Sequence, residues 1–191
     1  YYTGSVKVKI ELEYTRATGG GIGYTKAAGN YGGAFYPTSQ AIKEGYNQVI
    51  WTDHKEHKYI EESGTMNLML LIGDTFVTPP LTDRILAGVT RRSIITLVKE
   101  QGWAIEERPV TVDEIVEAAR TGALKEAFGM GTAAVVSKID TIGHEGTNYS
   151  IPTPADGKAM EIKRLLNDIR LGRTPDINQW MVDVVQPATA E

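Results

Sequence analysis

Apolar and polar positions alternate strictly over residues 6–12, where every second side chain is Val, Ile or Leu and the side chains between are Lys or Glu. This period of two is typical of a strand with one buried face. Residues 90–101 and 158–171 instead repeat their apolar side chains at the spacing of a helix. The pattern therefore predicts a strand at the start and two amphipathic helices later, the last of them ended by Gly172.

Several short apolar runs lie between these segments, bounded by glycine, proline or polar turns. They are residues 48–52, 58–60, 66–72, 75–77, 104–110, 133–142 and 149–151. Because short turns join neighbouring runs, we expect successive hairpins and therefore antiparallel pairing.

Two further helices are indicated by their end signals. Residues 31–45 have a helical pattern, with Pro37 as an internal kink or an early-turn residue. Another helix begins at the capping box of Thr111 and Glu114 and ends at Gly122. Together the elements predict an α+β domain built on an antiparallel sheet or pseudo-barrel with helices packed against it.

The length of 191 residues fits one domain. Hydrophobic residues make up 41% and charged residues 23% of the chain, which is ordinary for a globular protein. The net charge of -4 gives no electrostatic reason to expect a nucleic acid or an anionic membrane as partner. Cysteine is absent, which excludes disulfides and thiolate chemistry and agrees with a cytoplasmic location. No apolar run reaches the roughly 20 residues of a membrane helix, so we expect a soluble protein.

The two ends of the sequence differ in character. The chain begins with Tyr1 rather than Met, and a strand pattern follows almost at once, so we expect a piece of a longer protein. Residues 174–191 are predicted to be irregular, apart from a short segment at 180–185.

The histidines give no reason to expect a metal. His54, His57 and His144 fall in predicted turns, and no third ligand accompanies the first two. We therefore interpret them as solvated surface residues.

A glycine-rich loop at residues 16–24 precedes Lys26. Glycines permit backbone conformations that a side chain forbids and let a ligand approach closely. The loop has neither the Walker nor the Rossmann spacing. A lysine reacts with carbonyls only when its amine is neutral part of the time, which requires poor solvation or a neighbouring positive charge. Position alone does not distinguish Lys26 from a surface lysine.

The string GIGYTKAAGNY at residues 21–31 resembles the lysine motif of the branched-chain amino acid aminotransferases. These enzymes use pyridoxal 5′-phosphate (PLP) and have the D-amino-acid-aminotransferase-like fold, PLP fold type IV. The resemblance continues in order through residues 61–67, 78–81, 88–92 and 131–134. It covers nearly the whole chain but only the second half of a family member, so residues 1–191 are expected to be the C-terminal PLP-binding domain without the N-terminal domain.

The resemblance implies roles around the cofactor ring. Lys26 would form the Schiff base with PLP and shuttle the proton of the substrate α-carbon, and Tyr31 would hydrogen-bond the phenolic oxygen. Glu62 would pair with the pyridine nitrogen and keep the ring protonated, so that it accepts carbanion electrons. Glu61 is the adjacent alternative, but neighbouring strand side chains point to opposite faces, and the spacing to residues 64–67 favours Glu62. Without the motif, the tyrosine reads as a core residue and the two glutamates as an exposed acidic pair.

Other matched positions are assigned to the phosphate and to the substrate. Val89 and Thr90 begin a predicted helix, and helix N-termini bind phosphate. Thr132 would be a second hydroxyl donor to the phosphate. Thr132 and Ala133 also lie where the family binds the substrate carboxylate through backbone N–H groups. Arg91 and Arg92 either help to bind an anion or lie in solvent.

The chain departs from the family in two respects. Residues 134–137 replace the Cys-x-x-Cys of some relatives, so that thiol switch is absent. The arginine that clamps the phosphate, and most residues that receive the substrate side chain, belong to the absent N-terminal domain.

The implied activity is transfer of the amino group of L-leucine, L-isoleucine or L-valine to 2-oxoglutarate, in amino-acid biosynthesis, by a homodimer with only small-molecule substrates. A 4-amino-4-deoxychorismate lyase or a D-amino acid aminotransferase of the same fold is the alternative among enzymes. A third hypothesis is a catalytically impaired fragment, because the phosphate arginine and one wall of the substrate pocket are missing.

Overall fold

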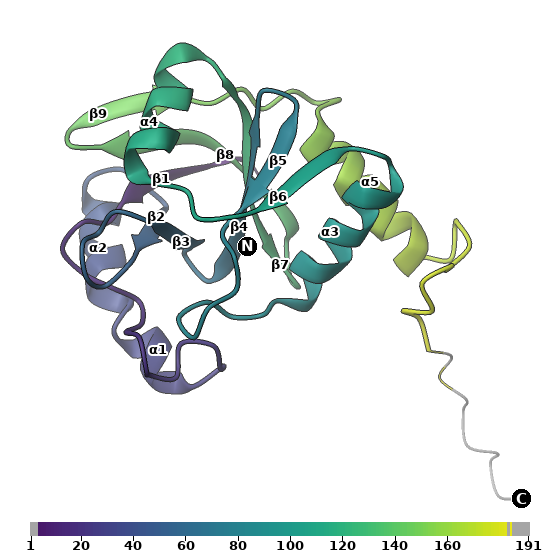
Figure 1. The fold of residues 1–191 in the computed structure, drawn as a ribbon, viewed down its shortest axis with the longest axis horizontal. Coiled ribbons are helices and arrows are strands. Elements are labelled where there is room, and N and C mark those ends of the chain that lie inside the picture. Colours follow the sequence, from purple (N-terminus) through teal and green to yellow (C-terminus); the bar gives the residue numbers. More distant parts are fainter. Residues whose placement is uncertain (1–3, 183, 185–191) are drawn as a thin grey trace, which may run out of the picture.

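The computed structural model describes residues 4–182 and residue 184. Its strands are β1 (Val6–Ile10), β2 (Gln48–Thr52), β3 (Ile60–Ser63), β4 (Met66–Ile72), β5 (Thr75–Thr78), β6 (Ala104–Glu107), β7 (Leu124–Gly131), β8 (Val135–His144) and β9 (Thr147–Ser150). Its helices are α1 (Ala28–Gly32), α2 (Phe35–Lys43), α3 (Val89–Glu100), α4 (Val112–Thr121) and α5 (Lys158–Arg170). In Figure 1, α3 and α5 pack together on one flank of the strands, and α1 and α2 lie on the other.

The strands close into a barrel. Their order is β3-β2-β1-β8-β7-β4-β5-β6, and the additional pairing of β3 with β4 joins the first and sixth strands of this series. The α+β class and the pseudo-barrel are thereby confirmed. The sheet is mixed rather than antiparallel throughout, because β1 is parallel to β2 and β8, and β5 is parallel to β6. Parallel neighbours need a crossover instead of a hairpin, and the crossover from β1 to β2 carries the glycine loop, α1 and α2.

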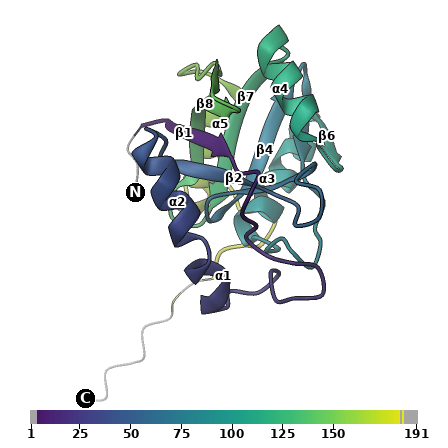
Figure 2. The same ribbon diagram turned by 90° about the vertical axis from the view of Figure 1, so that its left-hand side faces the viewer.

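Strand β4 is buried on both faces. Leu68 and Leu70 belong to the core inside the barrel, which also includes Ile115 of α4. Met69, between them, belongs to a second core formed with α3 and α5. Because alternate side chains of a strand point to opposite faces, a strand covered on both sides reads as the continuous apolar run of residues 66–72. Figure 2 shows α2 beside β2, with α1 beyond α2 and farther from the strands.

Most predicted helices are confirmed. Residues 90–101 and 158–171 correspond to α3 and α5. At the start of α4, Thr111 Oγ1 accepts the backbone N–H of Glu114 at 3.0 Å, and Gly122 ends the helix with a φ of 74°. Thr111 and Gly122 therefore act as the sequence indicates, whereas the Glu114 carboxylate accepts hydrogen bonds from Arg108 instead of completing the capping box.

The single helix predicted over residues 31–45 is wrong. Helix α1 ends at Gly32 and α2 begins at Phe35, so the helix is interrupted at the glycine pair 32–33, since glycine disfavours helix. Pro37 lies in the first turn of α2, where its missing N–H removes no helical hydrogen bond.

Strand β7 is absent from the prediction, because Leu124–Gly131 contains glycines and no β-branched side chain. Its glycines are set by packing. A Cβ at Gly129 would lie 2.6 Å from Cε of Met66, and one at Gly131 would lie 3.1 Å from its Cγ. The Met66 side chain therefore occupies the space that side chains of β7 would need.

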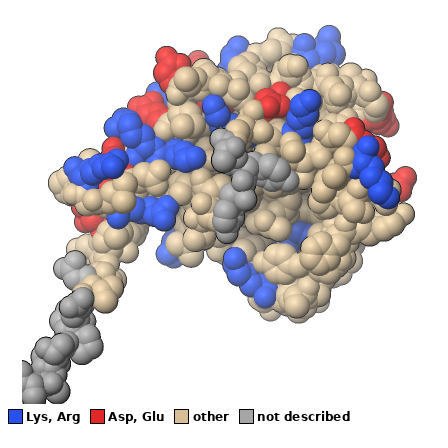
Figure 3. Space-filling view, turned by 180° about the vertical axis from the view of Figure 1, so that it is seen from behind, with Lys and Arg blue, Asp and Glu red and all other residues tan. Residues whose placement is uncertain are grey.

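Several element boundaries also differ from the prediction. The strand expected at residues 58–60 begins only at Ile60, and the one expected at 104–110 ends at Glu107. Within 180–185, residues 183 and 185 lie outside the described residues, and the others have no regular secondary structure. None of the described helices combines the length and apolar character that a membrane crossing needs. Acidic and basic side chains are both distributed over the face drawn in Figure 3.

Candidate functional site

A cavity of about 770 Å³ lies between the segment after the glycine loop, the β3–β4 hairpin, the start of α3 and the β7–β8 turn. It is lined by all seven residues that the sequence assigned to a site, namely Lys26, Tyr31, Glu62, Val89, Thr90, Thr132 and Ala133. Segments more than 100 residues apart in the chain therefore meet around one space.

Glu62 is the buried carboxylate of this cavity, with 3% of its surface exposed. Arg16 Nε lies 2.7 Å from its Oε2, and its Oε1 accepts Asn67 Nδ2 at 3.0 Å and the backbone N–H of Leu86 at 3.1 Å. Burial raises the pKa of the Glu62 carboxyl to about 7, although the Arg16 charge and the Leu86 N–H act to lower it. Glu62 therefore exchanges its proton near neutral pH.

The neighbouring Glu61 faces away from the cavity. It is also 3% exposed, and it forms an ion pair with Arg84 Nε at 2.5 Å. The exposed acidic pair considered from the sequence is therefore wrong, and the opposite orientation of adjacent strand side chains is confirmed.

Lys26 lines the same cavity as Glu62 and Val89, but its side chain is exposed to solvent. The expectation of a poorly solvated amine is thus wrong for this chain, because Lys26 lies where no described segment covers it. The backbone before Lys26 is nevertheless fixed by hydrogen bonds from the Asn30 side chain. Asn30 Nδ2 donates to the carbonyl oxygens of Ile22 at 2.8 Å and Thr25 at 3.0 Å, which fixes the turn that precedes Lys26.

Tyr31 extends from α1 to the cavity wall and is half-buried. The alternative of a core tyrosine is therefore wrong. No described residue forms a hydrogen bond with its hydroxyl group, which is free to bind a ligand in the cavity.

The start of α3 contributes backbone N–H groups rather than a side-chain cap. Gly88 is the N-cap residue and no side chain hydrogen-bonds the first turn, where Val89 is exposed and Thr90 half-buried. The first N–H groups of a helix have no partner within it, so they remain available to an anion. A Cβ at residue 88 would lie 2.1 Å from Asn67 Oδ1, so glycine is needed there to bring the helix start against Asn67.

Arg91 fits neither of its two predicted roles. It is 4% exposed, and its Nη2 donates to the carbonyl oxygen of Pro79 at 3.0 Å and to Glu107 Oε2 at 2.9 Å. A buried guanidinium requires such partners, which hold it away from the cavity. Arg92 is exposed, as one alternative expected.

Thr132 and Ala133 lie in the tight turn between β7 and β8, and both are exposed on the cavity side. In this turn the N–H of Val136 donates to Ala134 O at 2.7 Å, and Val135 has a φ of 62°. A β-branched residue in the left-handed region is strained, so the surrounding strands hold the turn in this conformation.

Arg16 and Gln48 also line the cavity, although the sequence assigned neither of them a role. Arg16 pairs with Glu62, and its Nη2 also donates to Gly23 O at 3.0 Å and to the carbonyl oxygen of Arg84. Gln48 Oε1 is buried without a hydrogen-bond partner. A buried carboxylate predicts some cationic partner. The sequence carries no signal for which cation it is.

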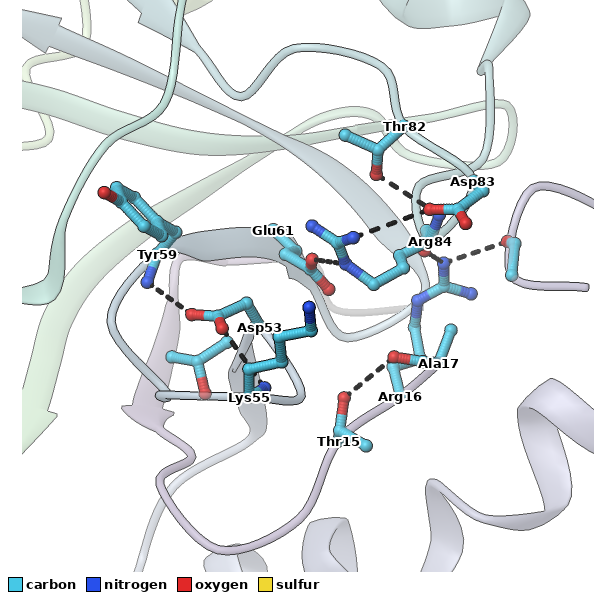
Figure 4. A network of polar contacts seen from close by, with 12 residues as sticks. Thr15, Arg16, Ala17, Asp53, Lys55, Tyr59, Glu61, Thr82, Asp83 and Arg84 are labelled. Atoms are coloured by element: carbon cyan, nitrogen blue, oxygen red, sulfur yellow. Dashed lines mark hydrogen bonds and ion pairs between the residues drawn. The ribbon is translucent and has the colours of Figure 1, made fainter. Parts of the chain in front are cut away.

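Asp53 organises the polar turn beside this network (Figure 4). Its carboxylate accepts the backbone N–H groups of Lys55, Glu56, Lys58 and Tyr59 at 2.8–3.2 Å. Partial burial acts to raise the pKa of Asp53, but the four donors outweigh it and lower the pKa to about 2. The carboxylate is therefore structural.

We expect Asp53→Ala to lower the free energy of unfolding by about 2 kcal/mol at pH 7, because four N–H groups lose their acceptor. The pKa is lower in the folded chain than the value of about 3.9 in unfolded chains, so ionised Asp53 stabilises the fold above pH 3.9 or so. This stabilisation is lost as the pH falls through about 2. Urea unfolding between pH 2 and pH 7 measures it, and a variant as stable as the parent at pH 7 would contradict the assignment.

The histidines are less exposed than expected. His54 and His57 are half-buried, and His57 Nδ1 lies 2.7 Å from Thr52 Oγ1. Within residues 4–182 and 184, no three His, Asp or Glu side chains are grouped as a metal ion would require.

Known proteins with similar sequences and structures share one description. The sequence profile of the family described as "Amino-transferase class IV" matches residues 23–142. The "Probable branched-chain-amino-acid aminotransferase" of Staphylococcus aureus (strain N315) is 41% identical over 189 residues, which cover 96% of this chain and 53% of the relative. The chain thus spans about half the length of the curated relatives it matches.

Two solved structures have the same fold. The branched-chain amino acid aminotransferase of Escherichia coli has a TM-score of 0.76 and 26% identity, covering 93% of this chain and 56% of that one. The enzyme of Thermobaculum terrenum "in PLP-form (holo-form)" has a TM-score of 0.74 and 23% identity, covering 89% of this chain and 52% of that one.

Proposed function

Because the chain belongs to the class IV aminotransferases, we propose that its cavity binds PLP and that the protein containing it transfers the amino group of leucine, isoleucine or valine to 2-oxoglutarate. The observation that carries the proposal is the buried Glu62 carboxylate in the same cavity as Lys26 and the uncapped start of α3. An amine, an acid and a set of free N–H groups fit an aldehyde, a pyridine nitrogen and a phosphate, respectively.

When bound, PLP supplies an electron sink for the negative charge left on the substrate α-carbon. Glu62 holds the cofactor by pairing with its pyridine nitrogen. A pKa of about 7 lets this carboxyl give up its proton at neutral pH, and Arg16 stabilises the carboxylate that results. Asn67 and the N–H of Leu86 fix the orientation of the carboxylate, because both bond the same oxygen.

The phosphate is assigned to the backbone N–H groups of Val89 and Thr90 and to the hydroxyl of Thr132. The Tyr31 hydroxyl would donate to the phenolic oxygen of bound PLP. Lys26 Nζ would be the nucleophile toward the aldehyde and would also carry the proton of the substrate α-carbon. Backbone N–H groups of the Thr132–Ala133 turn orient the substrate carboxylate.

The solvent-exposed side of the cavity is assigned to the remainder of the longer protein. We propose that it covers Lys26, excludes water and supplies the cationic contact to the phosphate, and that the whole protein is a cytoplasmic homodimer. The isolated chain is therefore expected to have less than about 1% of the transaminase activity of the full-length protein, since a site without one wall loses both positioning and water exclusion. A leucine and 2-oxoglutarate assay of both forms measures this, and equal specific activities would contradict it.

The proposal is tested by adding PLP to the chain and recording its absorbance before and after borohydride reduction, followed by peptide mapping. We expect an absorbance band of PLP bound to a lysine and a reduced label on Lys26. The exposed Lys43 of α2 is the internal control, because it lies outside the cavity. Equal labelling of Lys43 and Lys26 would disprove the assignment of the site.

A further inference from the structure

Adjacent glutamates of β3 are both buried, and each has its own arginine. Glu62 faces the cavity and pairs with Arg16, whereas Glu61 faces the opposite side and pairs with Arg84. Figure 4 shows the Glu61–Arg84 pair in a polar network that also includes Asp53, Asp83 and Arg16. Burial raises the pKa of Glu61, and the hydrogen bond and charge of Arg84 counteract this. Loss of Arg84 would leave an unpaired carboxylate in the interior.

The backbone around Arg84 is in direct contact with the glycine loop. Its carbonyl oxygen accepts Arg16 Nη2, and the neighbouring Asp83 Oδ2 accepts the N–H of Gly20 at 2.6 Å. A Cβ at Gly23 would lie 2.7 Å from the Arg84 Cα, so the loop packs directly on this backbone. The loop that precedes Lys26 is therefore positioned by residues 83 and 84.

The same segment continues to the other parts of the cavity. Two residues after Arg84, the N–H of Leu86 donates to Glu62, and Asn67 Nδ2 donates to Leu86 O at 2.8 Å. Gly88 then begins the turn into α3. Arg84 thus belongs to the segment that contacts the glycine loop before Lys26, the Glu62 carboxylate and the start of α3.

We propose that the Glu61–Arg84 ion pair positions the active site, by holding residues 83–86 between the glycine loop and β3 so that Lys26 and Glu62 keep a fixed relation. Neither Glu61 nor Arg84 lines the cavity, so both are positioning residues rather than catalytic ones. The chemistry assigned to Lys26 and Glu62 rests on the proposed function, whereas the contacts of the pair do not.

The variants separate this role from a general loss of stability. Arg84→Met removes the charge, Arg84→Lys keeps it, and Glu61→Gln/Arg84→Met removes both partners. Arg108→Met is the matched control, because Arg108 pairs with Glu114 at 2.6 Å and neither residue lines the cavity. The PLP dissociation constant and the share of borohydride-trapped PLP on Lys26 are measured well below each variant's melting temperature.

We expect Arg84→Met to weaken PLP binding about tenfold and to reduce the share of label on Lys26. Arg84→Lys is expected to keep most of the PLP affinity and most of the label on Lys26. The double variant is expected to keep more of each than Arg84→Met, because it leaves no buried carboxylate unpaired. The control Arg108→Met is expected to have the PLP dissociation constant and the Lys26 labelling of the parent chain. Arg84→Met and Arg108→Met with equal affinities and equal labelling of Lys26 would overturn the proposal, whatever their melting temperatures.

A pH profile gives an independent measurement. The charges of Arg16 and Glu61 act on Glu62, and those of Arg84, Asp53 and Arg16 act on Glu61. Glu61→Gln removes a like charge that raises the pKa of Glu62, so the midpoint of the pH dependence of PLP binding is expected to fall. An unmoved midpoint would show that the Glu61 charge does not act on Glu62.

Failure of the proposed function can be distinguished from failure of the positioning role. If the parent chain carries no label on Lys26, the PLP assignment fails, and the positioning role is tested by hydrogen exchange of residues 18–26. Arg84→Met is expected to speed this exchange at least about tenfold relative to Arg108→Met. Equal exchange rates would overturn the positioning role by itself.

Discussion

Lys26→Ala is expected to abolish PLP trapping at residue 26 and to reduce the transaminase activity of the full-length protein by about 10⁴-fold or more, because one amine serves as both nucleophile and proton carrier. The fold should not change, since the Lys26 side chain is exposed and has no ion pair within the described residues. Arg at this position keeps the charge but cannot form the bond, so Lys26→Arg is expected to be as inactive as Lys26→Ala.

Lys43→Ala is the matched control for this prediction, since it removes an exposed lysine that is outside the cavity. The measurements are absorbance of bound PLP, borohydride trapping and the leucine assay. Substantial activity in Lys26→Ala, with correct folding shown by an unchanged melting temperature, would contradict the assignment of Lys26 as nucleophile.

Glu62→Gln is expected to reduce kcat of the full-length protein by about 100-fold or more, because an amide cannot hold the pyridine nitrogen protonated. The change is nearly isosteric, so Asn67 and the N–H of Leu86 keep an oxygen acceptor. Arg16, however, loses its buried counter-charge. Glu114→Gln removes a carboxylate from another arginine pair at the surface and serves as the control.

The pH dependence of stability tests the environment of Glu62 without any cofactor. Its pKa in the folded chain is about 7, above the value of about 4.3 in unfolded chains. The proton bound by Glu62 therefore stabilises the folded chain fully below pH 4.3 or so, and this contribution is lost as the pH rises through about 7. We expect the stability of Glu62→Gln not to fall in this way as the pH rises. Urea unfolding of both chains at pH 4.5, 6 and 8 measures it, and parallel profiles would show that the pKa of Glu62 is not raised in the folded chain.

The local elements were largely predictable because their signals are short-range. The alternation at residues 6–12, the capping box at Thr111 and the stop at Gly122 each depend on neighbours within a few positions. The division between α1 and α2 was missed because the helical pattern continued past a pair of glycines. Strand β7 was missed for another reason, since its glycines are fitted to Met66, which is far away in the sequence.

The sequence predicted which residues line the cavity, but it did not predict which side chains surround and pair with them. Motif order placed Lys26, Glu62 and Thr132 together, and all three line one cavity. Neither the pairing of Arg16 with Glu62 nor that of Arg84 with Glu61 left a signal in the sequence. Arg16 follows β1, and Glu62 lies on β3; the two strands are brought near each other because both pair with β2.

By itself, the sequence determined the α+β class and most of the helices, because periodicity and capping act within a few residues of the chain. Its motifs also named candidate site residues that line one cavity. Only the tertiary structure decided the parallel pairing of β1, the exposure of Lys26 and the charge partners of the two glutamates. Burial and ion pairing depend on which distant segments meet in space, and barrel closure through β3 and β4 is the contact that brings them together.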